Sequence, residues 1–212
     1  VADVAEMVLE GDAADLDALL ASNHKEGKAL KDVLNDRVAT IGEKLDVRRF
    51  ERISTKGKVA GYIHGGGKIG VLVELATDSN DERVLTLGRD IAMQVAAMSP
   101  KYVSRDEVSQ EYMEHEKEIL LAQAKKENPE KPENIIEKMI IGRLNKEMKE
   151  ICLLDQVYVQ DSDLTVAKYV DKVAKENNAN VTVKKFVRFE TGEGLEKKVD
   201  DFAAEVAAQA GM

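Results

Sequence analysis

Apolar residues recur at intervals of three and four along much of the chain, a spacing that is typical of amphipathic helices. In the first segment the pattern is interrupted at Gly11-Asp12, which favours a break there. We therefore expect helices over residues 1–21 (with that break), 26–44, 81–98, 163–177 and 195–210.

The spacing changes to that of β-strands in two parts of the chain. The pattern predicts strands over residues 46–54, 58–64, 69–75 and 181–189. The first three are joined by short links, Lys56-Gly57 and Gly65-Gly66-Gly67. Links of this length containing glycine suit tight turns, so we expect an antiparallel meander.

Residues 104–151 are highly charged and predict two further helices. Ser104 and Glu107 have the spacing of a capping box, which predicts a helix that begins at Ser104. Its apolar seam would consist of Val108, Tyr112, His115, Ile119 and Ala122. The second helix follows Pro132 and carries Ile136, Ile140, Leu144, Met148 and Ile151. Each helix has one narrow apolar stripe, so we expect an antiparallel coiled-coil hairpin that projects as an arm.

Two segments of the chain resemble each other. Val47–Ile53 parallels Val183–Phe189, and each follows an amphipathic helix. The fold class is therefore α+β, with two related subdomains, each with helices packed on a small antiparallel sheet, and the coiled-coil hairpin inserted in the second. We expect a first core subdomain at 1–100, the arm at 101–152, a second core subdomain at 153–194 and a C-terminal helix at 195–212.

The composition limits the classes of function. The 212 residues include 31 Lys and Arg against 40 Asp and Glu, a net charge of −9, which argues against direct nucleic-acid binding. Cys152 is the only cysteine, which fits a reducing compartment, and we expect a cytoplasmic protein. The chain has no run of about 18 apolar residues, so we expect no membrane partner. The sequence leaves the oligomeric state open.

Groups of residues that could carry out chemistry are few. Gly65, Gly67 and Gly70 satisfy G-x-G-x-x-G, but a strand follows them where a dinucleotide site needs a helix. A hairpin turn explains these glycines better. The histidines and the cysteine are too dispersed for a metal site; they are His24, His64, His115 and Cys152. We therefore expect no catalytic residues, no metal and no cofactor, and a protein that acts by binding another protein.

Four segments, in order along the chain, resemble the bacterial translation elongation factor Ts family. They are Gly61–Leu75, Asp90–Ala97, Phe186–Leu195 and Asp201–Val206. The predicted arm and repeat are similar to the coiled coil and the two core subdomains of that family. The resemblance implies a guanine-nucleotide exchange factor for the GTPase elongation factor Tu. Such a factor disturbs the Mg²⁺ and phosphate site of the GTPase so that GDP leaves, and it makes or breaks no bond.

The resemblance also implies which residues touch the GTPase. They are Ile69 and Gly70 in the glycine-bearing hairpin, Gln94, Val159, and Phe202 and Gln209 in a docking helix at 195–212. Gln94 stands where some members have a histidine, and Gln209 where some have a methionine. Ordinary core packing is the alternative interpretation of Ile69 and Val159.

Members of the family begin with a small helical domain and a Thr-Asp-Phe segment, neither of which precedes Val1. We therefore expect a fragment that binds the GTPase weakly and exchanges nucleotide poorly. Two other functions stay open at this point. One is a coiled-coil adaptor or assembly protein without nucleotide coupling, and the other is a nucleotide-binding enzyme that uses the glycine run.

Overall fold

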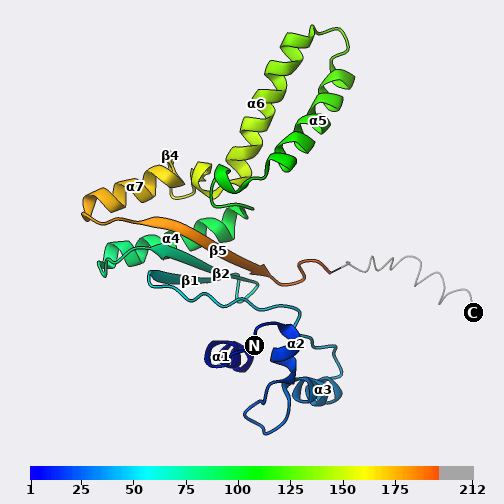
Figure 1. Ribbon diagram of the computed structural model, residues 1–212, viewed down its shortest axis with the longest axis vertical. Helices are drawn as coiled ribbons and strands as arrows, with labels where there is room; N and C mark the ends of the chain where they lie inside the picture. Colours follow the sequence, from blue (N-terminus) through cyan, green and yellow to red (C-terminus); the bar gives the residue numbers. More distant parts are fainter. Residues whose placement is uncertain (196–212) are drawn as a thin grey trace, which may run out of the picture. The chain divides into compact units, whose positions relative to one another are not determined.

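The computed structural model describes residues 1–195, and these form two compact units that divide after Thr55 (Figure 1). The architecture mixes helices with small antiparallel sheets, which confirms the α+β class. The predicted helix at 195–210, with Phe202 and Gln209, lies outside the described residues. The subdomain boundaries at 100, 152 and 194 stay a prediction.

The first unit is helical. It contains α1 (Ala2–Glu10), α2 (Leu16–Ala21) and α3 (Leu30–Ile41). The break expected at Gly11 is present, and the Asp15 carboxylate caps α2 by accepting a hydrogen bond from the Ala18 amide at 2.8 Å. Leu19 and Leu30 are fully buried and anchor this unit.

The strand predicted over residues 46–54 is absent. Residues 44–55 have no regular secondary structure, so this prediction is wrong. The alternating pattern found no neighbouring strand to pair with, and a strand without a partner is not stable. The Arg52 guanidinium instead donates to the carbonyl oxygens of Val8 and Gly11. The sequence likeness to residues 183–189 therefore does not extend to the same secondary structure.

The second unit is built on a three-stranded antiparallel sheet. Its strands are β1 (Lys58–His64), β2 (Ile69–Ala76) and β5 (Thr182–Glu190), in the order β1-β2-β5. These strands agree with the predicted ones to within one residue at each end. Gly65, Gly66 and Gly67 have positive φ angles of 59°, 66° and 94°, which side chains disfavour, so the glycine run is a hairpin turn.

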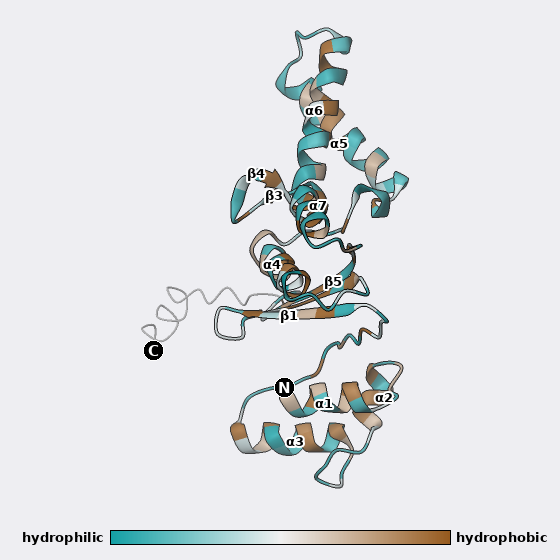
Figure 2. Cartoon of the chain, turned by 90° about the vertical axis from the view of Figure 1, so that its left-hand side faces the viewer, coloured by the Kyte–Doolittle hydropathy of each residue, from teal (hydrophilic) through white to brown (hydrophobic). Residues whose placement is uncertain are grey.

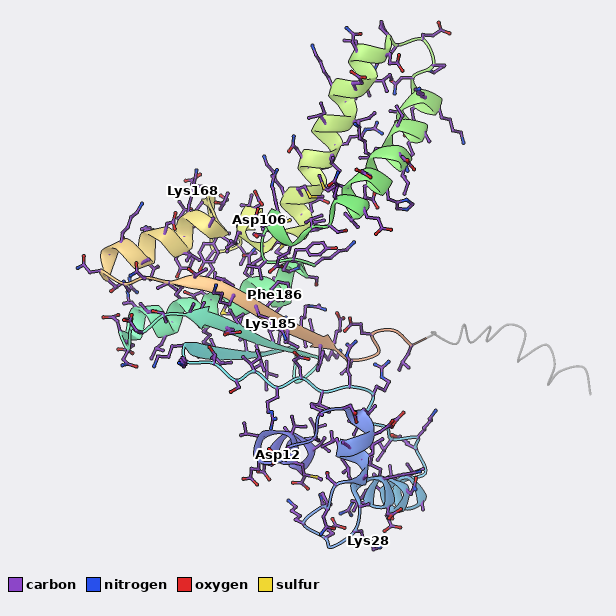
Figure 3. All side chains as sticks on the ribbon, viewed as in Figure 1. Asp12, Lys28, Asp106, Lys168, Lys185 and Phe186 are labelled. Carbon is purple, nitrogen blue, oxygen red and sulfur yellow. The ribbon has the colours of Figure 1, made fainter. Side chains whose placement is uncertain are left out.

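One face of this sheet carries the main core. The buried residues Val71, Val73 and Leu75 of β2 alternate with residues on the opposite face, and α4 (Glu82–Met98) packs against them (Figure 2). Phe186 and Lys185 lie next to each other on β5 (Figure 3). Phe186 contacts this core, and Lys185 pairs with Glu74 of β2.

A second helix and a small hairpin complete the core. Helix α7 (Val166–Glu176) packs on α4, and its Val166, Val170 and Val173 are buried. The helix predicted from residue 163 begins later, because residues before it form β4 (Asp161–Thr165), which pairs with β3 (Val157–Tyr158). The Thr165 side chain then caps α7 by accepting from the Lys168 amide.

Helices α5 (Gln110–Glu127) and α6 (Glu133–Ile151) lie side by side as a hairpin (Figure 1). The prediction that α5 begins at Ser104 is wrong. Ser104 caps a short 3₁₀ helix, η1 (Arg105–Glu107), and α5 has its own cap, Ser109, which accepts from the Tyr112 amide at 3.1 Å. The Glu107 carboxylate binds the Val103 amide at 2.7 Å, so it serves the 3₁₀ turn.

The predicted seam residues of α6 are largely buried, whereas on α5 the prediction is right for Tyr112, which is half-buried and bonded to Glu147 of α6, and wrong for the residues that follow it. Ile136, Ile140 and Met148 of α6 are buried, as expected. On α5 the predicted seam residues His115, Ile119 and Ala122 are exposed. The residues of α5 that pack against α6 are Met113, Leu120, Leu121 and Ala124. Apolar residues occupy two adjacent stripes of α5, and contact with α6 selects the stripe that the spacing did not indicate.

Candidate functional site

Ile69 and Gly70 begin β2, directly after the glycine turn. Ile69 is half-buried and packs on the core, so core packing accounts for part of its side chain. Gly70 stands opposite Ile63 on β1 and Phe189 on β5. A Cβ added at Gly70 would meet no atom within 4 Å, so the fold does not require glycine there for space.

The most exposed apolar side chain beside Gly70 is Ile63, which the sequence analysis did not single out. Its side chain is 74% exposed, although it belongs to a strand. The alternation along β1 could have indicated this exposure, because Val59, Gly61 and Ile63 alternate with residues that face the core. Ile63 pairs with Gly70 and shares its face of the sheet, whereas Ile69 lies on the core face with Val71.

Polar groups surround this end of the sheet. The Tyr62 hydroxyl and His64 Nδ1 are 3.0 Å apart, and Arg188 donates to the Glu190 carboxylate at 2.7 Å. The Thr191 amide donates to the Lys68 carbonyl at 2.9 Å. This last bond ties the end of β5 to the glycine turn and fixes the hairpin that presents Ile63 and Gly70.

Gln94 lies inside the second unit. Its side chain is 0% exposed, although the family resemblance implies that it touches a partner. Its amide nitrogen donates to Gln156 Oε1 and to the Val157 carbonyl, both at 3.1 Å. Its amide oxygen accepts from the Val159 backbone amide at 2.9 Å. Every one of these contacts is to the segment around β3.

Gln156, which the sequence analysis missed, is the second buried amide of this group. It follows the 3₁₀ helix η2 (Leu153–Asp155), and its nitrogen donates to the Glu150 carbonyl in the last turn of α6 at 2.7 Å. The sequence offered little signal for Gln156. Gln94 was more visible, because it occupies the apolar face of α4 with Leu87, Ile91 and Val95.

Val159 lies in the turn between β3 and β4, and its side chain is 47% exposed. The alternative that Val159 is an ordinary core residue is therefore wrong. The neighbouring Tyr158 is buried, and its ring stacks on that of Tyr169 at 4.2 Å between centroids. The Tyr169 hydroxyl donates to the Asp90 carboxylate at 2.5 Å, and burial together with this bond raises the pKa of Tyr169.

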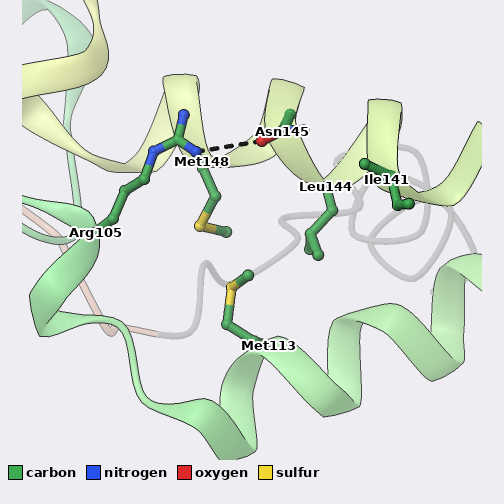
Figure 4. Close-up of a pocket in the computed structure, with 6 residues that line it drawn as sticks. All are labelled: Arg105, Met113, Ile141, Leu144, Asn145 and Met148. Carbon is green, nitrogen blue, oxygen red and sulfur yellow. Dashed lines mark hydrogen bonds between the residues drawn. The ribbon is translucent and has the colours of Figure 1, made fainter. Parts of the chain in front are cut away.

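A hollow of about 210 Å³ lies between the base of α5 and α6 (Figure 4). Arg105 crosses its edge and donates to Asn145 at 3.2 Å and to Asp155 at 3.1 Å. The rest of the lining is apolar and comprises Met113, Ile141, Leu144 and Met148. These bonds link the first turn before α5 to α6 and to η2.

The described residues offer little for chemistry of their own. Within residues 1–195, no group of His, Cys, Asp and Glu side chains could hold a metal ion. Cys152 is buried, and burial raises the pKa of its thiol, which disfavours the reactive thiolate. In the same part of the chain, no helix has the length and apolar character that crossing a membrane requires.

The site geometry thus consists of exposed apolar side chains on a hairpin and on a turn, held by buried polar groups. An exposed apolar side chain gains free energy when a partner covers it, so this geometry is compatible with binding another protein. Comparison with known sequences defines the family. The sequence model described as "Elongation factor TS" matches residues 1–193.

Named relatives agree with this match. "Elongation factor Ts" of Clostridioides difficile (strain 630) is 58% identical over 209 residues, which cover 99% of this chain and 68% of the relative. That of Syntrophotalea carbinolica is 50% identical, over 97% of this chain and 68% of the relative. That of Clostridium perfringens (strain 13 / Type A) is 46% identical, over 98% of this chain and 68% of the relative. The chain belongs to the elongation factor Ts family.

Proposed function

We propose that this chain is a guanine-nucleotide exchange factor for elongation factor Tu in translation elongation. It binds the GDP-bound GTPase and disturbs the site that holds Mg²⁺ and the phosphates, so that GDP leaves. The observation that carries the proposal is the family match over residues 1–193, with 58% identity to a named relative. The factor acts in the cytoplasm by binding, without a cofactor or a chemical step of its own.

The match does not favour the two alternatives. An adaptor without nucleotide coupling would leave membership of an exchange-factor family unexplained. A nucleotide-binding enzyme would need a helix after the glycine run to bind phosphates. The run instead turns β1 back into β2.

The partner-binding surface of this proposal lies on the second unit. Gly70 and Ile63 form its hairpin part on one face of the sheet, with Ile69 beside them on the core face, and Val159 forms its turn part. Exposed Ile and Val side chains lose their contact with water when a partner covers them, which stabilises the complex by about 25 cal/mol per Å² of apolar surface. Phe202 and Gln209, which lie outside the described residues, are further proposed contacts.

The organisation of the molecule also belongs to the proposal. We assign α5 and α6 as a coiled-coil arm inserted in the second core subdomain. Support comes from the packing of Ala124 against Ile136 and Ile140. The cross-helix bond from the Tyr112 hydroxyl to the Glu147 carboxylate at 2.7 Å adds to it.

Exchange of this kind is a coupling between two binding equilibria. If the factor weakens GDP binding to the GTPase by some ratio, GDP must weaken binding of the factor by the same ratio. The chain should therefore co-elute with elongation factor Tu in the absence of free nucleotide and separate from it when GDP is in excess. Co-elution that is indifferent to GDP would contradict the exchange mechanism and favour the adaptor.

A release assay tests the surface directly. Elongation factor Tu loaded with fluorescent GDP is mixed with the chain, and we expect release faster than the spontaneous rate. Ile63→Asp and Val159→Asp should each slow that release by about tenfold or more, since a charge would be buried in the interface. Ile135→Asp, at an exposed isoleucine of α6, is the matched control and should have no effect. Equal rates for all three variants would refute the surface.

A further inference from the structure

Two buried amides join three separate parts of the second unit. Gln94 comes from the middle of α4, and Gln156 follows η2. The nitrogen of Gln94 donates to the oxygen of Gln156 at 3.1 Å, and the nitrogen of Gln156 donates to the Glu150 carbonyl at 2.7 Å. A continuous chain of hydrogen bonds thus runs from α4 to the last turn of α6.

The remaining bonds of Gln94 fall on one short piece of backbone. Its nitrogen donates to the Val157 carbonyl, and its oxygen accepts from the Val159 amide. These two groups flank Tyr158, whose buried ring stacks on Tyr169. The turn is therefore held on both sides of Tyr158 by the Gln94 amide and at Tyr158 by its ring.

The chemistry of glutamine suits this position closely. Its amide has two donors and one acceptor oxygen, and here both donors and the oxygen are used. A carboxylate of the same length could accept from Val159 but could not donate to Val157. A buried polar group without partners costs stability. The three hydrogen bonds of Gln94 therefore favour the one arrangement of the turn in which all of them are made.

We propose that Gln94 and Gln156 are positioning residues that hold the Val157–Val159 backbone so that Val159 projects toward the partner. Gln94 itself does not touch the partner, because its side chain has no exposed surface. This inference rests on the proposed function and changes the role of one residue in it. It also links the presentation of Val159 to the base of the arm through the Glu150 carbonyl.

A double-mutant cycle separates positioning from direct contact. Gln94→Met keeps the length and packing of the side chain and removes its hydrogen bonds. We expect Gln94→Met and Val159→Ala each to weaken binding to elongation factor Tu by about tenfold, with the double variant close to Val159→Ala alone. Two losses that multiply in the double variant would show that Gln94 acts independently of Val159, and would overturn the proposal.

Amide hydrogen exchange supplies the readout that a general loss of stability would not give. In Gln94→Met the Val159 amide should exchange at least tenfold faster, while the Val95 amide within α4 keeps its protection. A Val159 amide as protected as in the unaltered chain would also overturn the proposal. Faster exchange at both amides would report unfolding and would refute a local role for Gln94.

Two further variants complete the design. Gln123→Met, at an exposed position of α5, is the matched control and should change neither binding nor exchange at Val159. Gln156→Met should weaken binding by a smaller factor than Gln94→Met, because the direct bonds to Val157 and Val159 remain. If the unaltered chain fails to bind elongation factor Tu, the proposed function fails. If the unaltered chain binds elongation factor Tu, and Val159→Ala weakens that binding while Gln94→Met does not, only the positioning role fails.

Discussion

Gly88 on α4 and Gly142 on α6 allow one substitution to be tested in two opposite environments. Both lie inside helices, where replacing glycine by alanine gains about 1 kcal/mol of helix propensity. A Cβ at Gly142 would meet nothing within 4 Å, whereas one at Gly88 would lie 2.7 Å from the Ala60 Cβ and 3.1 Å from Leu75 Cδ1. The atoms around each glycine therefore decide whether the substitution by alanine raises or lowers the free energy of unfolding.

The magnitude at Gly88 follows from these distances. Carbon atoms pack at about 3.5–4.0 Å, so α4 must move away from the sheet by about 1 Å to admit the new methyl group. Ala60 Cβ is fixed to the strand backbone and cannot rotate aside. Overpacking of this kind costs about 1–3 kcal/mol, which is equal to or larger than the gain of about 1 kcal/mol in helix propensity. Because the Ala60 Cβ cannot move aside, we expect a cost in the upper part of that range, about 2–3 kcal/mol, so that Gly88→Ala lowers the free energy of unfolding by about 1–2 kcal/mol net.

Thermal unfolding followed by circular dichroism measures the difference. For a chain of this size, Gly88→Ala should lower Tm by about 2–8 °C. Gly142→Ala should slow amide exchange in α6, because added helix propensity stabilises the hairpin. A double variant with Ala60→Gly removes the closest clash and should recover part of the loss, although Ala60→Gly alone destabilises β1 by about 0.5–1 kcal/mol. A melting temperature for Gly88→Ala at or above that of the unaltered chain would refute the reasoning.

Three further outcomes are expected. The Glu147 carboxylate raises the pKa of Tyr112 by accepting its hydrogen bond, so the folded chain holds this proton more tightly than the unfolded one. This stabilisation is complete below the unfolded pKa of about 10 and is lost as pH rises above it. Between pH 10 and 12, the free energy of unfolding measured in urea should therefore fall less steeply with pH in Tyr112→Phe than in the unaltered chain. Tyr169→Phe removes the donor to Asp90 and should cost about 1–2 kcal/mol in urea unfolding, with a neutral result contradicting the structural role of this bond. Ala124→Leu should overpack the contact between α5 and α6 and cost about 1–3 kcal/mol, visible as faster amide exchange in both helices; unchanged exchange would show that this contact is loose.

Elements with a single possible pairing were predictable from the sequence. Strands β1, β2 and β5 alternate clearly, and the glycine run between β1 and β2 leaves only a turn. The seam of α6 was also predictable, because Ile136, Ile140, Leu144 and Met148 recur at intervals of four, although Ile135 and Ile141 lie outside that stripe. The seam of α5 was not, since Leu120 and Ile119 are neighbours and only contact with α6 decides which faces inward.

The errors elsewhere have the same origin. Residues 46–54 alternate as a strand would, but the pattern does not say whether a partner strand is available. Of the candidate site, Ile69, Gly70 and Val159 were identified through family resemblance. The exposure of Ile63 and the burial of Gln94 needed the three-dimensional structure, because sequence spacing does not reveal which polar residue finds internal partners.

The strand order β1-β2-β5 has a consequence for how the chain folds. Ile69 at the start of β2 pairs with Glu190 at the end of β5, about 120 residues away, and closing so long a loop carries an entropic cost that grows with its length. The β1–β2 turn and the α5–α6 hairpin are local and form without that cost. We expect both to form early and to shorten the loop that remains, so that β5 joins the sheet as the last and slowest step.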